Sequence, residues 1–181
     1  RMRQFHQINC ECIGAEEPHA DAEVIIMLMQ FLDKLGLKEL TVSLNSLGCR
    51  ECRPAYREAL SAFLRTLDTE KLCENCRRRM STNPMRVLDC KEEACQALIA
   101  DAPRVVDYNC EACRTHLATV CSLLERSKVD YTLNPRLVRG LDYYTRTTFE
   151  VLSGNIGAQA AVTGGGRYDG LVRELGGPDV P

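Results

Sequence analysis

The segment with the richest chemistry reads Leu-Val-Arg-Gly-Leu-Asp-Tyr-Tyr over residues 137–144. Arg139 carries a guanidinium that can hold two oxygens of a phosphate or carboxylate at once. Tyr143 and Tyr144 follow with hydroxyls that can donate or accept a hydrogen bond. These residues indicate an anion-binding site. A surface arginine beside two half-buried tyrosines without a ligand would explain the same sequence.

A second segment, Gly-Gly-Gly-Arg-Tyr-Asp, covers residues 164–169 and follows a predicted strand. Gly164, Gly165 and Gly166 have no side chains, so a ligand can come close to the backbone there. A wide bulge or a turn would account for three glycines equally well.

The opening segment, residues 3–11, alternates in a way that predicts a strand. With side chains on alternate faces, Phe5, Gln7 and Glu11 share one face together with Asn9. That face is unusually polar for a strand.

The cysteines suggest a second kind of site. The chain has 11 cysteines, an odd number, without a secretory signal, so we expect thiols or a metal site. Two Cys-x-x-Cys pairs lie at a spacing typical of a four-thiolate zinc site, and further candidates follow them. The pairs are Cys49 with Cys52 and Cys73 with Cys76; the further candidates are Cys90, Cys95, Cys110 and Cys113. Against zinc, Cys73, Cys76, Cys113 and Cys121 fall on predicted helices, where buried cysteine is an ordinary core residue.

The densest positive run is Arg77-Arg78-Arg79. A solvated helix face is the simplest interpretation, and contact with nucleic-acid phosphates is the alternative. A net charge of −2 excludes a uniformly basic binder, so any such contact must be regional. His6, His19 and His116 match no catalytic pairing, and no role is assigned to them.

The apolar runs of the sequence exclude a membrane span. The longest apolar run, residues 24–29, is far shorter than the roughly 20 residues that span a bilayer. No targeting segment is recognised, and a cytoplasmic location is expected. The chain opens and stops within patterned segments, so we expect a piece of a longer protein.

Glycine usage indicates the organisation that must position these residues. No glycine occurs between Gly48 and Gly140, whereas nine of the 12 fall between Gly140 and Gly177. The middle is therefore predicted to be helical and the end to be sheet and loop. We expect an α+β fold with a largely antiparallel sheet and an inserted helical domain, divided at 1–47, 48–130 and 131–181.

Hydrophobic periodicity supplies the individual elements. Helices are predicted at 18–36, from residue 54, at 69–80, along the stripe 113–124 and at 168–175, and strands at 40–45, 131–133, 147–152 and 158–163. The three central helices, from residue 54 to residue 124, each have one apolar face and are expected to pack as a small bundle.

Taken together, the segments resemble the histidyl-tRNA synthetases, which are class II aminoacyl-tRNA synthetases. Residues 3–7, Arg-Gln-Phe-His-Gln, resemble the second half of class II motif 2, and the segments at 137–144 and 164–169 resemble the two histidine-specific signatures. Residues 83–89 resemble part of the insertion domain. The resemblance covers essentially the whole chain in the family's order.

The resemblance implies a role for each of these residues. Gln7, Glu11, Arg139, Tyr143 and Tyr144 would bind L-histidine, and Arg139 would also be catalytic beside the α-phosphate. Arg1, Arg3, Phe5 and Gly164 to Gly166 would bind ATP, which enters with Mg²⁺. The arginines at 77–79 would face tRNA(His), and the parent enzyme would be a homodimer.

The resemblance also implies what this chain lacks. Motif 1, the start of motif 2, motif 3 and the anticodon-binding domain are not recognised in it, so we expect the isolated chain to form no histidyl adenylate. Two other hypotheses remain: a histidine-sensing, synthetase-like regulatory subunit, and a zinc-stabilised interaction module. The intact arginine–tyrosine signature favours the enzyme over the sensor. The third hypothesis explains only the middle of the chain.

Overall fold

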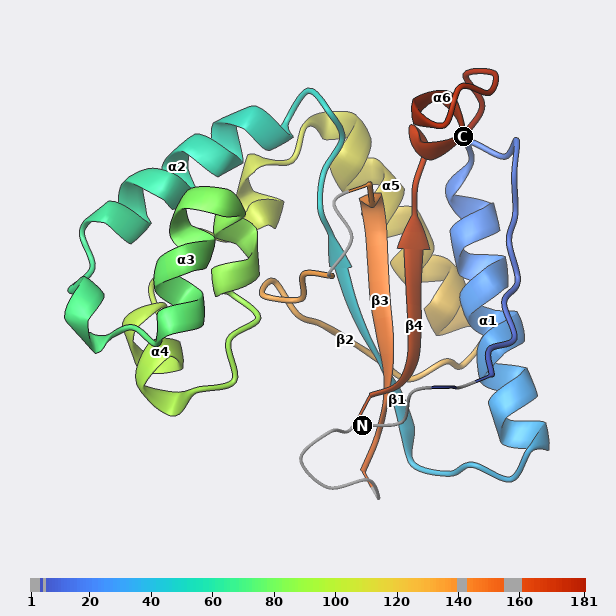
Figure 1. The fold of residues 1–181 in the computed structure, drawn as a ribbon. Coiled ribbons are helices and arrows are strands. Elements are labelled where there is room, and N and C mark those ends of the chain that lie inside the picture. Colours follow the sequence, from blue (N-terminus) through green and yellow to red (C-terminus); the bar gives the residue numbers. More distant parts are fainter. Residues whose placement is uncertain (1–3, 5, 140–142, 155–160) are drawn as a thin grey trace.

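The computed structural model describes residues 4, 6–139, 143–154 and 161–181, and consists of a four-stranded sheet, two long helices and a group of shorter helices beside them (Figure 1). The elements in chain order are α1 (Pro18–Lys34), β1 (Leu40–Ser46), α2 (Arg53–Arg65), η1 (Thr69–Lys71), α3 (Glu74–Thr82), η2 (Pro84–Val87), α4 (Glu93–Leu98), η3 (Val105–Tyr108), α5 (Glu111–Arg126), β2 (Tyr131–Leu133), β3 (Thr145–Ser153), β4 (Ala161–Arg167) and α6 (Leu171–Glu174).

The sheet has the order β2-β1-β3-β4. β1 pairs with β2 in parallel and with β3 in antiparallel, and β3 pairs with β4 in antiparallel. The β3–β4 ladder shifts register between Thr145 and Thr148 and again between Val151 and Leu152. The predicted α+β class with a largely antiparallel sheet is confirmed.

α1 and α5 pack against each other and against the sheet, and their apolar faces form one core with β1 and β3. Its buried members are Ile25, Leu32, Val42, Leu44, Val120, Leu124, Phe149 and Val151. The prediction that α5 joins the helical bundle is therefore wrong. Its apolar stripe meets the strands because β1 and β3 expose a wide aliphatic surface that α1 alone does not cover.

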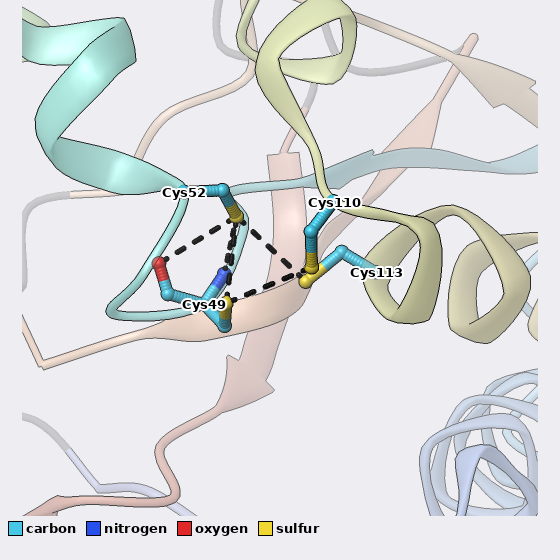
Figure 2. A group of neighbouring side chains, drawn as sticks. All are labelled: Cys49, Cys52, Cys110 and Cys113. Carbon is cyan, nitrogen blue, oxygen red and sulfur yellow. Dashed lines mark hydrogen bonds between the residues drawn. The ribbon is translucent and has the colours of Figure 1, made fainter.

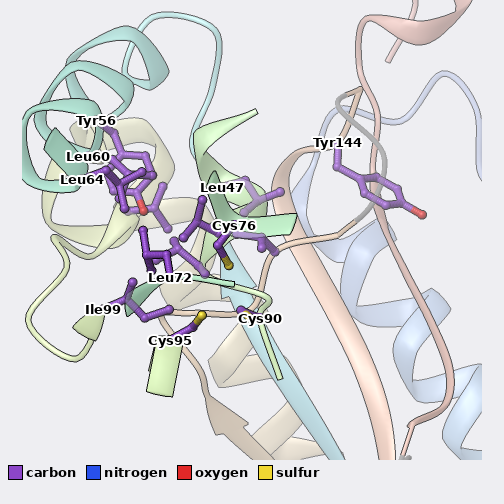
Figure 3. Packing of buried hydrophobic residues seen from close by; sticks show 14 residues of the cluster. Leu47, Tyr56, Leu60, Leu64, Leu72, Cys76, Cys90, Cys95, Ile99 and Tyr144 are labelled. Atoms are coloured by element: carbon purple, nitrogen blue, oxygen red, sulfur yellow. The ribbon is translucent and has the colours of Figure 1, made fainter. Parts of the chain in front are cut away.

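The remaining central helices form a separate core around α2, with Tyr56, Leu60 and Leu64 fully or almost fully buried (Figure 3). We refer to residues 48–109 as the helical unit, because α5 begins after it and packs elsewhere. The packing favours ending the inserted unit near residue 109, and we propose that boundary in place of 130.

The helix predicted over 69–80 is interrupted. A 3₁₀ turn ends at Lys71, Leu72 and Cys73 are extended, and α3 begins at Glu74. Leu72 is 2% exposed, so burying it in the helical unit takes precedence over helix propensity. The Sγ atom of Cys73 accepts a hydrogen bond from the N–H of Cys76, which caps α3.

The strand predicted for residues 3–11 is also absent where the structure describes it, since residues 4 and 6–13 belong to no helix or strand. A strand needs a neighbour that offers a ladder of hydrogen bonds, and these described residues pair with no strand of the sheet. Just after them, the N–H of Gly14 donates to the carbonyl of Pro181 at 2.8 Å. By contrast, β4 runs farther than predicted and includes Gly164 to Gly166.

Asp21 in α1 connects the layers through a buried carboxylate. Its oxygens accept hydrogen bonds from Arg167 at 2.7 and 2.9 Å and from Thr147 at 2.5 Å, and lie 2.6 Å from Nε2 of His116. The side chains of Asp21 and Arg167 are only 8% and 5% exposed. Burial acts to raise the pKa of Asp21, but His116, Arg167 and Thr147 together hold it below its ordinary value. His116, to which the sequence assigned no role, is thus a structural residue.

Replacing Asp21 by asparagine removes the more deeply buried of the two carboxylates that pair with Arg167 and leaves the guanidinium only Asp169, whose side chain is 28% exposed. We expect Asp21→Asn to lower the free energy of unfolding by about 3–5 kcal/mol, measured by chemical denaturation. The matched control is Asp33→Asn on the same helix, whose partner Lys38 and own side chain are both 68% exposed. Asp33→Asn should lower the free energy of unfolding by less than about 1 kcal/mol.

The pH dependence follows from the lowered pKa of Asp21. Its ionised form contributes stability above the ordinary value of 3.8, and this contribution disappears as the pH falls through the lower folded value. The Asp21→Asn protein should lack this component of acid unfolding. Equal destabilisation of the two variants, or an unchanged acid limb, would contradict the role of this carboxylate.

Candidate ligand pocket and cysteine clusters

A pocket of about 780 Å³ opens between the opening segment, α1 and the adjacent strands β3 and β4. Every described residue that the sequence predicts to bind histidine or to form the floor beneath the substrates lines it. These residues are Gln7, Glu11, Arg139, Tyr143, Tyr144, Gly164, Gly165 and Gly166. The pocket joins parts of the chain that are more than 130 residues apart. Arg1, Arg3 and Phe5 lie outside the described residues.

The glycines of β4 make room for side chains of the pocket itself. A Cβ atom on Gly164 would lie 2.7 Å from the carbonyl oxygen of Phe149 and 3.1 Å from Nη1 of Arg139. A Cβ atom on Gly166 would lie 3.0 Å from the ring of Tyr144. These distances are too short for an ordinary Cβ contact, so the absence of side chains allows Arg139 and Tyr144 to lie directly against β4.

Arg139 is held by a carboxylate that sequence reasoning missed. Its Nη1 atom donates to Oε1 of Glu150 at 2.5 Å, and the two side chains are about one quarter exposed. Glu150 lies on β3 directly opposite Gly164. The bond fixes a guanidinium with five N–H donors at the pocket wall, where it can bind an anionic group.

Three tyrosine rings form the next part of the wall. Tyr143 contacts Tyr144 and Tyr168 edge to face, with ring centroids 5.1 and 6.1 Å apart. The hydroxyl of Tyr168 donates to Oε2 of Glu11. Burial and the adjacent Glu11 carboxylate raise the pKa of Tyr168, so the phenol stays protonated. Tyr168 was missed as a site residue, although it lies just beyond the glycine run.

Burial likewise raises the pKa of Tyr144, which is 8% exposed. The wall thus places tyrosine hydroxyls, the Glu11 carboxylate and the Arg139 guanidinium around a common space. Such a set can recognise a small molecule with both an anionic group and a polar ring, because the donors and acceptors converge from different sides.

The arginines of the basic run lie apart from this pocket, on α3. Arg77 and Arg78 are exposed, and Arg78 also bonds to Asn75. Arg79 is half-buried and donates to the carbonyl of Arg86 at 3.0 Å. The run therefore divides into two solvent-facing cations and one with a structural bond.

The cysteines form two clusters, and neither has the composition predicted from the spacing. The stem cluster combines Cys49 and Cys52 with Cys110 and Cys113 (Figure 2). The inner cluster combines Cys73 and Cys76 with Cys90 and Cys95. The predicted set of Cys49, Cys52, Cys73 and Cys76 is thus wrong. The first Cys-x-x-Cys pair precedes α2 and the second lies at the start of α3, and folding gives each pair other partners.

All eight thiols are free in this structure. Partial burial acts to raise the pKa of the Cys49 thiol, but the N–H groups of Cys52 and Glu51 lower it to about 7. The N–H of Cys76 likewise lowers the pKa of Cys73 to about 7. Among the described residues, these clusters are the groups of side chains with the geometry to hold a metal ion. The described carboxylates of the pocket form no such group.

Comparison with known proteins agrees with this geometry. The profile of the histidyl-tRNA synthetase family matches residues 1–180. The chain is 66% identical to the histidine–tRNA ligase of Oleidesulfovibrio alaskensis and 63% identical to that of Nitratidesulfovibrio vulgaris, in each case over its full length and 43% of the relative. The chain therefore spans less than half the length of these relatives.

Among solved structures, the apo histidyl-tRNA synthetase of S. aureus matches with a TM-score of 0.68 and 38% identity, over 93% of this chain and 40% of that one. A Bacillus halodurans protein described as an ATP phosphoribosyltransferase regulatory subunit/histidyl-tRNA synthetase matches at 20% identity with a TM-score of 0.57, over 92% of this chain and 47% of that one, which shows a shared fold only.

The mixed sheet, its helical insertion and these matches define a domain of the class II aminoacyl-tRNA synthetase type. Within that class, the chain belongs to the histidyl-tRNA synthetase family. None of the helices in the described ranges combines the length and apolar character that crossing a bilayer requires.

Proposed function

We propose that this chain is part of a histidine–tRNA ligase, which activates L-histidine with ATP to histidyl adenylate and then transfers the histidyl group to tRNA(His). The observation that carries the proposal is the convergence of Glu11, Arg139 and the paired tyrosines on one pocket. Membership of the family supports it independently.

In this proposal, the histidine side chain enters beside Glu11. A carboxylate accepts a hydrogen bond from one imidazole N–H, and a tyrosine hydroxyl serves the other ring nitrogen. Tyr143 and Tyr144 line the same pocket, as does Gln7. The hydrogen bond from Tyr168 to Glu11 orients the carboxylate.

Arg139 has the catalytic role in this proposal. Negative charge accumulates at the α-phosphate as the histidine carboxylate attacks and pyrophosphate leaves. A guanidinium already fixed by Glu150 can stabilise that charge without reorganising and without proton transfer. Phe5, Arg1 and Arg3 are proposed to contact ATP, and Mg²⁺ is proposed to enter bound to the ATP phosphates. A homodimeric assembly is part of the same proposal.

The proposal is tested by histidine-dependent ATP–pyrophosphate exchange. The full-length protein that contains this chain should catalyse the exchange, whereas the 181-residue chain alone should not. The reason is that the described pocket offers Arg139 as its accessible guanidinium, while ATP carries several phosphate charges to neutralise. Histidine binding without exchange by the full-length protein would support a sensor instead. Exchange by the short chain would contradict the expected dependence on the rest of the enzyme.

Removing the guanidinium should affect the chemical step. We expect Arg139→Ala in the full-length protein to lower kcat for exchange by about 100-fold or more, with a smaller change in the KM for histidine, measured by steady-state kinetics. The matched control is Arg136→Ala, three residues earlier. Arg136 donates to the carbonyl of Ala100, away from the pocket. A decrease of activity to the same extent in both variants would contradict a specific role for Arg139.

Contact between α3 and tRNA gives a separate test. We expect Arg77→Ala/Arg78→Ala to weaken tRNA binding and to reduce the slope of log K against log salt by about 0.7–0.9 for each phosphate that these arginines neutralise. Arg79 is retained because its bond to Arg86 supports the fold. Binding is measured by fluorescence titration at several salt concentrations.

The control for this experiment removes the same charge elsewhere. Lys71→Ala/Lys91→Ala deletes two cations whose side chains are 70% and 85% exposed. This pair should leave the salt dependence close to that of the unmodified protein. An equal effect of both double variants would indicate a general charge effect and contradict binding of tRNA at α3.

A further inference from the structure

We propose that the stem cluster and the inner cluster each bind one Zn²⁺ ion through four cysteine thiolates, so that the chain carries two structural zinc sites. The proposal rests on three features of the described residues: the separations of the sulfur atoms, the backbone groups that face them, and the segments that the two clusters connect. It is independent of the proposed aminoacylation activity.

The sulfur separations fit a single tetrahedral ion. A Zn–S distance of about 2.3 Å places the sulfurs of a regular tetrahedron about 3.8 Å apart. In the stem cluster, the Sγ atom of Cys49 lies 3.5 Å from that of Cys52 and 3.9 Å from that of Cys110, and the Sγ atoms of Cys52 and Cys113 are 3.9 Å apart.

The inner cluster has the same dimensions. The Sγ atoms of Cys73 and Cys90 are 3.8 Å apart, and in both clusters all four sulfurs lie within 4.8 Å of one another. A disulfide requires about 2.05 Å between sulfurs, so these groups are not bonded pairs. A polynuclear iron–sulfur cluster places several irons and sulfides between its thiolates and needs them farther apart. Thiolate ligands in tetrahedral geometry favour zinc as the single ion.

Backbone N–H groups are arranged to stabilise thiolates. The N–H of Cys49 donates to Sγ of Cys52 at 3.1 Å, and the N–H of Cys73 donates to Sγ of Cys95 at 3.2 Å. The N–H of Cys76 donates to Sγ of Cys73 at 3.4 Å. Such bonds orient metal-binding sulfurs and partly offset their negative charge.

Gly48 adds a steric requirement at the stem cluster. Its φ of +71° lies in the left-handed region, and a Cβ atom there would approach Sγ of Cys52 to 2.7 Å. Only glycine allows the chain to turn at this point while Cys49 and Cys52 both face the other two cysteines. The conformation of this turn thus leaves space for the sulfur atom of Cys52.

The clusters occupy positions where a metal would have the greatest structural effect. Cys49 and Cys52 follow closely after β1, whereas Cys110 and Cys113 lie at the start of α5, so the stem cluster connects the entry and the exit of the helical unit (Figure 2). The inner cluster joins the start of α3 to Cys90 and to α4. A unit of about 60 residues buries only a small core, and units of this size commonly use metals or disulfides for stability.

Four cysteines complete each tetrahedron and leave no open position, as in structural rather than catalytic zinc sites. The two sites would therefore hold the helical unit together and fix it to the sheet. They would not take part in the chemistry of the pocket.

The test is metal analysis of the full-length protein, purified without chelator from cells grown in ordinary medium. We expect two zinc ions per chain. Cys52→Ser/Cys113→Ser should remove one zinc and leave the inner site, and Cys76→Ser/Cys95→Ser should do the converse. Cys121→Ser is the matched control, because Cys121 is a partly buried cysteine of α5 outside both clusters, and it should keep two.

A second measurement does not depend on the folding of variants. Titration of the unmodified protein with an organomercurial should release two zinc ions as eight thiols react, and cobalt substitution should give the sulfur-to-metal charge-transfer band and intense visible bands of tetrahedral thiolate coordination. Zinc content near zero, iron in place of zinc, disulfides in the clusters, or equal zinc loss in the Cys121→Ser control would overturn the proposal. A failure of the activity test with two zinc ions present would count against the proposed function alone.

Discussion

The Asp21 carboxylate bonds to groups from α5, β3 and the end of β4, which are distant in the sequence and adjacent in the fold. A buried ion pair stabilises the folded state little more than an apolar contact of the same size would. An arrangement that buries one charged partner without the other, however, is strongly destabilised. The relative positions of these elements are therefore tightly specified. Arg167 also donates to the carbonyls of Ala15 and Glu17, so the same network anchors the segment that leads to the pocket.

The pocket depends on this network because its wall belongs to β4. Arg167 is the last residue of β4, the strand whose glycines leave space for the side chains of Arg139 and Tyr144. The next residue, Tyr168, donates a hydrogen bond to Glu11. A short segment thus contributes both to the pocket wall and to the buried ion pair: Gly164 to Gly166 line the pocket, Arg167 bonds to the Asp21 carboxylate, and Tyr168 donates to Glu11. The alternation of side chains along an extended segment makes both uses compatible.

The helical unit meets a different constraint. It leaves the sheet after β1 and returns at α5, and its core is separate from that of the sheet. A unit of this size must be held where the chain enters it and where the chain leaves it if it is to keep a fixed position relative to the sheet. The proposed zinc site at the stem cluster satisfies this requirement with ligands from both connections, whereas additional apolar residues would have enlarged an exposed surface.

Local pattern determined much of this protein. Hydrophobic periodicity located α1, β1, α2 and β3 to within a few residues, because each element has one face that must be buried whatever its neighbours are. The glycine run and the arginine–tyrosine signature identified six of the residues that line the pocket, since side-chain chemistry can be read from the sequence. The family resemblance predicted that these segments contribute to one site.

Tertiary structure decided the rest, for reasons that no local pattern contains. α5 has an apolar face that suits either the bundle or the sheet, and only the wide surface of β1 and β3 selects the sheet. The opening segment alternates like a strand, but a strand exists only where a neighbour offers its hydrogen bonds. Glu150, Tyr168 and His116 acquire roles from partners 11, 157 and 95 residues away. The cysteine partners likewise depend on how α2 and α3 pack, because spacing along a chain does not fix distance in space.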